Sequence, residues 1–166
     1  IKFGGEGSGY RADVETFDGS TWTEVANLNT GRKQGAAATK GTTTSTLYAG
    51  GEPGYTAISE TWDGTSWSEG NNLNEGRSGM TGCGIVTSAM AIGGDEPPRT
   101  AATEVYDGTS WSEVGDLGTA ITNNAGIGSN ATEAFSCGGT PTPPVYTNAV
   151  EEWADPSYTI KTVTTS

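Results

Sequence analysis

The sequence contains no histidine and only two cysteines, Cys83 and Cys137. Histidine is the usual general base near neutral pH, so its absence excludes catalytic triads of the Ser-His-Asp type and imidazole-ligated metal sites. Two cysteines are too few for a zinc site or a disulfide framework, and we expect both to be small buried thiols. The sequence therefore predicts no metal, no cofactor and no enzymatic activity.

Basic residues are also scarce, since 8 Lys and Arg face 20 Asp and Glu and the formal net charge is −12. Contact with a nucleic-acid backbone needs clusters of Lys and Arg, so nucleic acid is excluded as a partner. No apolar run approaches the ~20 residues of a membrane-spanning helix, and membrane insertion is not expected.

Glycine is abundant, with 26 residues, and the chain repeats itself. An aromatic residue, a short acidic turn and a second aromatic residue recur at 17–22, 62–67, 106–111 and, in degraded form, 153–158. The first aromatic residues, Phe17, Trp62, Tyr106 and Trp153, are 45, 44 and 47 residues apart. A fixed period of this length indicates a repeat architecture in which each unit buries its apolar face against its neighbours.

The second unit shows what each repeat contains. Its sequence predicts strands over 35–41, 45–51, 58–63 and 66–69, with turns between them. Four antiparallel strands of this size describe one blade of a β-propeller. The first strand is rich in small residues because blades converge near the axis. Where blades diverge, we expect aromatic side chains to fill the space between them, namely Trp22, Trp67, Trp111 and Tyr158.

The predicted fold is therefore an all-β propeller made of a single array over residues 1–166. Its units are 1–27, which lacks the inner strand, then 31–70, 76–114 and 121–166. Three and a half blades are short of most propellers, which have about 4 to 8. We expect a fragment of a larger ring; a four-bladed ring with an imported strand and a ring completed by association of chains are the alternatives.

A glutamate lies two residues before the third-strand aromatic residue of every unit, at Glu15, Glu60, Glu104 and Glu151. An arginine enters the inner strand in two units, at Arg32 and Arg77. The planar guanidinium suits a partly buried carboxylate, so we predict that Arg32 pairs with Glu15 or Glu60, and Arg77 with Glu60 or Glu104. The next unit has Ile121 in place of arginine, and Glu151 needs another donor there.

The aspartates of the recurring turn are Asp18, Asp63 and Asp107. Their spacing lacks the alternating oxygen ligands of a calcium loop. They are predicted to accept backbone hydrogen bonds in a turn where the following glycine adopts a positive φ.

The loop between the second and third strands varies most from unit to unit. Loops on a rigid scaffold commonly bind ligands, although simple drift of loop sequence is the alternative interpretation. Tyrosine offers a flat amphipathic surface suited to sugars or proteins. The candidate ligand-binding residues of this loop face are Tyr10, Tyr55, Arg99 and Tyr146.

A glycine pair closing the second strand, an acid and an aromatic residue in the third, and a tryptophan after a short turn together resemble the kelch repeat, whose units are propeller blades. The compressed turn Asp-Gly-Thr-Ser-Trp at 63–67 resembles short acidic kelch-like arrays in virion and tail-fibre proteins of tailed bacteriophages. Without histidine, the copper site of galactose-oxidase-type kelch enzymes is missing.

The resemblance implies a non-enzymatic structural and binding module at a virion surface, in a tail fibre, an appendage or a capsid decoration. Its expected partners are a host surface glycan or neighbouring virion or surface proteins, including further copies of the chain. The expected location is the virion surface or the extracellular space. The alternative is a secreted or cell-surface bacterial propeller domain that accompanies a carbohydrate-active enzyme.

Overall fold

A computed structural model describes residues 1–141 and 145–154, and the backbone of 159–163. All regular structure in these residues is β-structure. The described part of the chain therefore has no helix that could cross a membrane.

The strands form four separate antiparallel sheets, which we call blades 1 to 4. Blade 1 contains β1 (Lys2–Phe3), β2 (Val14–Phe17) and β3 (Trp22–Val25). Blade 2 contains β4 (Ala36–Ala37), β5 (Thr46–Ala49), β6 (Ser59–Trp62) and β7 (Trp67–Glu69). Blade 3 contains β8 (Thr81–Ile85), β9 (Ser88–Ile92), β10 (Thr103–Tyr106) and β11 (Trp111–Glu113). Blade 4 contains β12 (Ala125–Asn130), β13 (Glu133–Cys137), β14 (Val150–Ala154) and β15 (Thr159–Val163).

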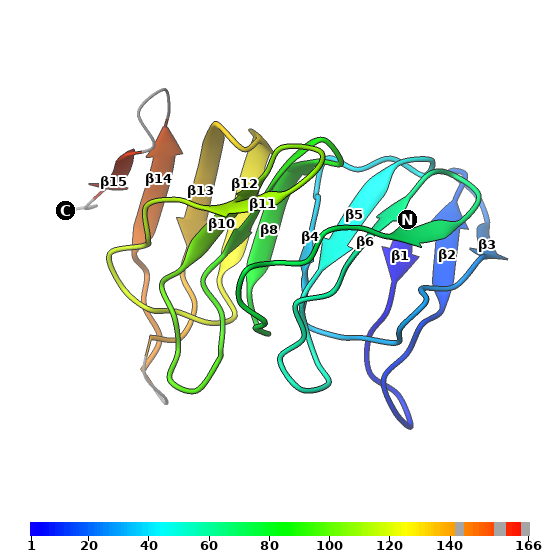
Figure 1. The fold of residues 1–166 in the computed structure, drawn as a ribbon, viewed down its shortest axis with the longest axis horizontal. Coiled ribbons are helices and arrows are strands. Elements are labelled where there is room, and N and C mark those ends of the chain that lie inside the picture. The colour runs from blue at the N-terminus through cyan, green and yellow to red at the C-terminus, as the bar shows by residue number, and fades with distance from the viewer. Residues whose placement is uncertain (142–144, 155–158, 164–166) are drawn as a thin grey trace.

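Each blade is a meander whose strands follow chain order, and the blades stand side by side from blade 1 at one end to blade 4 at the other (Figure 1). The predicted all-β, propeller-like architecture is confirmed, and blade 1 lacks the inner strand as expected. The inner strand of blade 2 is shorter than the predicted 35–41, because β4 forms regular pairs only at Ala36 and Ala37.

The inner strands β4, β8 and β12 lie next to one another, and glycine permits this approach. A Cβ atom on Gly82 would lie 2.5 Å from the carbonyl oxygen of Ala37 in the neighbouring blade. A Cβ atom on Gly126 would lie 2.7 Å from the side chain of Thr81. The glycines of the inner strands therefore let adjacent blades meet backbone to backbone.

Aromatic side chains fill the space between blades 1 and 2. The ring of Phe3 lies 5.2 Å from Trp67 and 5.0 Å from Tyr48, measured between ring centroids. Val14 and Leu28 are buried in the same cluster. Trp67 thus packs against the preceding blade, as predicted.

The same arrangement recurs along the array. Leu47 and Leu73 lie in one buried cluster with Trp111 of blade 3. Met90 of blade 3 lies in another with Trp153 of blade 4. Trp111 is therefore interblade packing too, and blades 2 and 3 each bury their aromatic pair against the blade before them.

The prediction that Trp22 packs between blades is wrong. Its side chain is 53 % exposed, and its ring stacks on Phe17 of the same blade, with centroids 5.1 Å apart. The physical reason is that the aromatic pair faces the preceding blade, and no blade of the described chain precedes blade 1. Tyr158, also predicted to pack between blades, lies outside the described residues.

Both cysteines are unpaired. Cys83 is fully buried between blades, and desolvation raises the pKa of its thiol to about 11. Cys137 is only half-buried, so the prediction of a buried thiol is wrong there. Cys137 alternates with buried Ser136 and shares a sheet face with exposed Phe135, and no further blade covers that face in the described chain.

Replacement of Gly82 by alanine tests the close approach of the inner strands. The new methyl group meets backbone atoms that cannot rotate away, and we expect the free energy of unfolding to fall by about 1–3 kcal/mol. Gly9→Ala is the control, because a Cβ atom there would meet nothing within 4 Å. Urea unfolding measures both variants, and equal stability of the two would contradict the packing described.

Candidate functional site

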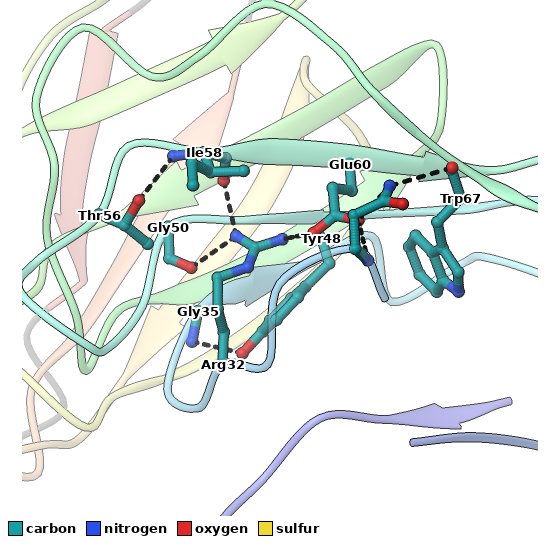
Figure 2. A network of polar contacts seen from close by, with 9 residues as sticks. Arg32, Gly35, Tyr48, Gly50, Thr56, Ile58, Glu60 and Trp67 are labelled. Atoms are coloured by element: carbon teal, nitrogen blue, oxygen red, sulfur yellow. Dashed lines mark hydrogen bonds and ion pairs between the residues drawn. The ribbon is translucent and has the colours of Figure 1, made fainter. Parts of the chain in front are cut away.

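Arg32 comes from the linker between blades 1 and 2 and is completely buried. Its Nη2 donates to Oε1 of Glu60 over 2.8 Å, and its Nη1 donates to the carbonyl oxygens of Gly50 and Ile58 over 2.9 and 2.7 Å. The guanidinium carbon lies 4.7 Å from the ring centroid of Tyr48 (Figure 2). The linker thus inserts a cation into blade 2 and closes the junction.

The second carboxylate oxygen of Glu60 is also occupied. It accepts the backbone N–H of Asn29 over 2.8 Å and the side-chain Nδ2 of Asn29 over 2.9 Å. The same Nδ2 donates to the carbonyl oxygen of Trp67 over 3.1 Å. Glu60 is fully buried, and an arginine and an asparagine from one linker supply its hydrogen bonds.

The arrangement repeats one unit later. Arg77 Nη1 donates to Oε1 of Glu104 over 2.6 Å, while Asn74 donates its backbone N–H and its Nδ2 to Oε2 over 2.7 and 2.8 Å. The predicted arginine–glutamate pairing is confirmed, and in both cases the glutamate belongs to the blade that follows the linker. We call this set of one arginine, one asparagine and one glutamate the junction clamp.

The asparagines of the junction clamp were not predicted. The signal was present, because asparagine stands three residues before the arginine in both linkers, Asn29 before Arg32 and Asn74 before Arg77. Spacing alone does not show that a main-chain N–H and a side-chain amide of one residue meet the same carboxylate oxygen.

The other two repeat glutamates depart from the clamp. At the third junction, the backbone N–H of Gly118 donates to Glu151 over 2.7 Å, and Ile121 packs in the apolar cluster. The expected alternative donor is therefore present. Glu15 does not pair with Arg32; it lies half-exposed, 3.8 Å from Lys2 Nζ.

The aspartates of the recurring turn accept hydrogen bonds from backbone N–H groups of the same turn. Oδ1 of Asp63 accepts the N–H groups of Thr65 and Ser66, both over 2.8 Å, and Asp18 and Asp107 repeat the pattern. These backbone hydrogen bonds lower the pKa of all three carboxyl groups. The glycines that follow have φ between 96° and 107°. The turn prediction is confirmed, and the described residues contain no group of acids, cysteines or histidines suited to a metal ion.

The loops between the second and third strands, as far as the structure describes them, project from the same edge of the array, the lower edge in Figure 1. We call this the loop edge. Tyr10 is 46 % exposed there, and its hydroxyl donates to Glu52 of the next loop over 3.4 Å. Lys33 Nζ lies 5.6 Å from the Tyr10 ring centroid and pairs with Glu6 and Glu52 at 3.0 and 3.4 Å. The first two loops are therefore tied together.

The remaining predicted loop residues are separate. Tyr146 is 80 % exposed, whereas Tyr55 and Arg99 are half-buried. Over the described ranges, no hydrogen bond or ring contact joins Tyr10, Tyr55, Arg99 and Tyr146 to one another. They share an edge without forming one cluster, so Tyr10 with Lys33, Glu6 and Glu52 is the assembled part of the loop edge. The sequence analysis did not identify Lys33.

Removing the cation of one junction clamp tests how much the clamp contributes to the stability of the fold. Arg77→Met leaves the buried Glu104 carboxylate without a counter-charge, and we expect the free energy of unfolding to fall by about 3–5 kcal/mol. Lys2→Met is the control, since it removes the cation beside a half-exposed glutamate and should cost at most about 1 kcal/mol. Urea unfolding at neutral pH measures both, and similar losses would show that burial does not matter here.

Comparison with known proteins gives the fold only. No family model matches the chain. No curated protein matches it in sequence. A solved structure described as "Structure of YjhT" has a similar fold, with a TM-score of 0.75 at 14 % identity, over 93 % of this chain and 52 % of that one. The chain therefore has a propeller-like fold and spans about half the length of the protein that it matches.

Proposed function

We propose that the chain is a non-enzymatic structural and binding module of the kelch-like type, carried on a virion surface in a tail fibre, an appendage or a capsid decoration. Its loop edge binds a host surface glycan or a neighbouring virion protein. The observation that carries this proposal is the cluster of Tyr10, Lys33, Glu6 and Glu52, which joins the first two loops of the loop edge and leaves Tyr10 and Glu6 exposed.

The placement of the repeat acids supports binding over catalysis. Glycoside hydrolysis commonly needs two carboxyl groups that face each other across a substrate. Glu60 and Glu104 are buried and fully engaged by the junction clamps, and Glu151 accepts a main-chain N–H. The Glu60 and Glu104 carboxylates are therefore committed to joining blades and are not free to protonate a bound sugar.

The cluster at the loop edge suits a neutral sugar. The Tyr10 ring offers an apolar face for the C–H surface of a sugar ring. Glu6 and Glu52 are acceptors for sugar hydroxyl groups, and Lys33 holds both of them beside the ring. With a net charge of −12, the chain repels anionic glycans, so uncharged glycans are the favoured ligands.

Binding to an array of neutral glycans tests the loop edge. We expect Tyr10→Ala to weaken binding by about tenfold, because it removes the stacking surface. Ile85→Ala is the control, since Ile85 is an exposed apolar residue at the end of β8, away from the loop edge. Unchanged binding by the Tyr10 variant would contradict the site, and turnover of a glycoside by the chain alone would contradict a non-enzymatic role.

The virion location has a separate test. Antibodies raised against the chain should label intact phage particles in immunogold electron microscopy, at a tail or capsid surface. Labelling of the bacterial surface in cells that carry no phage would contradict the virion assignment and favour the bacterial propeller domain.

A further inference from the structure

The third junction, between blades 3 and 4, lacks both side chains that the junction clamps use as donors. Gly118 stands at the repeat position of Asn29, and Ile121 at that of Arg32. The side chain of Ile121 lies against the chain at Gly139, where an added Cβ atom would be 2.9 Å from Cγ1 of Ile121. The third linker therefore brings neither a side-chain amide nor a cation to Glu151.

The Glu151 carboxylate nevertheless keeps the orientation of its counterpart in blade 2. The backbone N–H of Gly118 donates to Oε2 of Glu151 over 2.7 Å, as that of Asn29 donates to Oε2 of Glu60 over 2.8 Å. In the first junction the other oxygen, Oε1 of Glu60, accepts Arg32 over 2.8 Å. Among the hydrogen bonds between described residues, none ends on Oε1 of Glu151. This oxygen can therefore accept a donor at the place where the first junction has a guanidinium.

Two carbonyl groups of the first junction are also repeated. Arg32 donates to the carbonyl oxygens of Gly50 and Ile58 (Figure 2), and Gly138 and Ala149 hold these repeat positions in blade 4. The N–H of Gly138 donates to the carbonyl oxygen of Ala149 over 2.9 Å, as Gly50 does to Ile58. Gly138 and Gly50 share a left-handed conformation, with φ of 61° and 67°. The backbone that receives a guanidinium in blade 2 is thus present in blade 4.

A cavity of about 30 Å³ lies between these acceptors. Glu151, Gly138 and Ala149 line it from blade 4, and Ile121 and Thr119 line it from the linker. One water molecule needs about 10–15 Å³ of such space, so the cavity can take a group larger than a water. All of these lining residues are described, and the cavity belongs to a junction that is present within the chain.

The cavity can be reached from solvent. Thr119 and Ala149 on its rim are exposed, and Glu151 is partly exposed, whereas Arg32 and Arg77 close the corresponding places in the first two junctions completely. The net charge of −12 attracts cations to the surface. A cationic group from outside the chain can therefore approach Glu151.

We propose that this cavity is a binding site for a guanidinium group carried by a ligand. One carboxylate oxygen and two carbonyl oxygens form the acceptor set that holds the Arg32 guanidinium in blade 2. A planar guanidinium directs its N–H groups to several such acceptors at once, whereas an ammonium ion is a compact and strongly hydrated charge. The site is separate from the cluster around Tyr10 at the loop edge, so it does not depend on the proposed glycan binding.

An NMR titration tests the proposal, with the amide of Gly118 as the reporter because it is hydrogen-bonded to Glu151. We expect guanidinium chloride to shift this resonance saturably, with a dissociation constant of about 10 mM. Ammonium chloride should bind at least about tenfold more weakly. Sodium chloride at the same concentrations corrects for ionic strength. N-acetylarginine amide, used in parallel, distinguishes an arginine side chain from a small guanidinium compound as the ligand, and binding of either supports the site.

Three variants locate the binding. Glu151→Gln should weaken guanidinium binding at least about tenfold, because it removes the charged acceptor. Glu152→Gln is the matched control, since the same charge is lost from the opposite face of β14, and it should leave binding unchanged. Ile121→Arg places the chain's own guanidinium in the cavity and should abolish binding.

Ile121→Lys, whose ammonium can also reach Glu151, replaces Ile121→Arg if that variant does not fold by circular dichroism. Absence of a saturable shift, ammonium binding as tight as that of guanidinium, or guanidinium binding that survives either Glu151→Gln or the substitution of Ile121 would each overturn the proposal.

Discussion

The arrangement of the blades depends on a carboxylate buried where two sheets meet. Glu60 and Glu104 have no exposure to water, and an ionised group in that position is costly unless donors surround it. The linker from the preceding blade delivers those donors, an arginine and an asparagine three residues apart. A blade can therefore bury its glutamate only when the linker before it is in place. The packing of each of these blades thus depends on the segment that precedes it in the chain.

The third junction reaches the same geometry by different means. Ile121 replaces the arginine and joins the apolar cluster with Leu117 and Trp153. Glu151 keeps one main-chain donor and remains partly exposed, so it needs less compensation than a buried glutamate. Apolar packing and ion pairing are thus alternative ways to hold two adjacent blades together.

Features that recur with the repeat could be predicted from sequence, because recurrence exposes shared roles. The strand order, the Asp63 type of turn and the Arg32–Glu60 pairing all follow from residues at fixed positions in each unit. The exposure of Trp22 could not, because burial depends on what lies across the face and not on the residue. The tie between Tyr10 and Lys33 likewise depends on how two loops approach in space.

The junction clamp also bears on how such an array can change length. The second unit contributes the acceptor for the linker before it, Glu60, and the donors for the unit after it, Asn74 and Arg77. Duplication of this whole unit would therefore leave every buried acceptor opposite an arginine and an asparagine. Recombination at this period can lengthen the protein without compensating substitutions, whereas the third unit, whose linker carries Ile121, could not precede a blade with a buried glutamate in the same way.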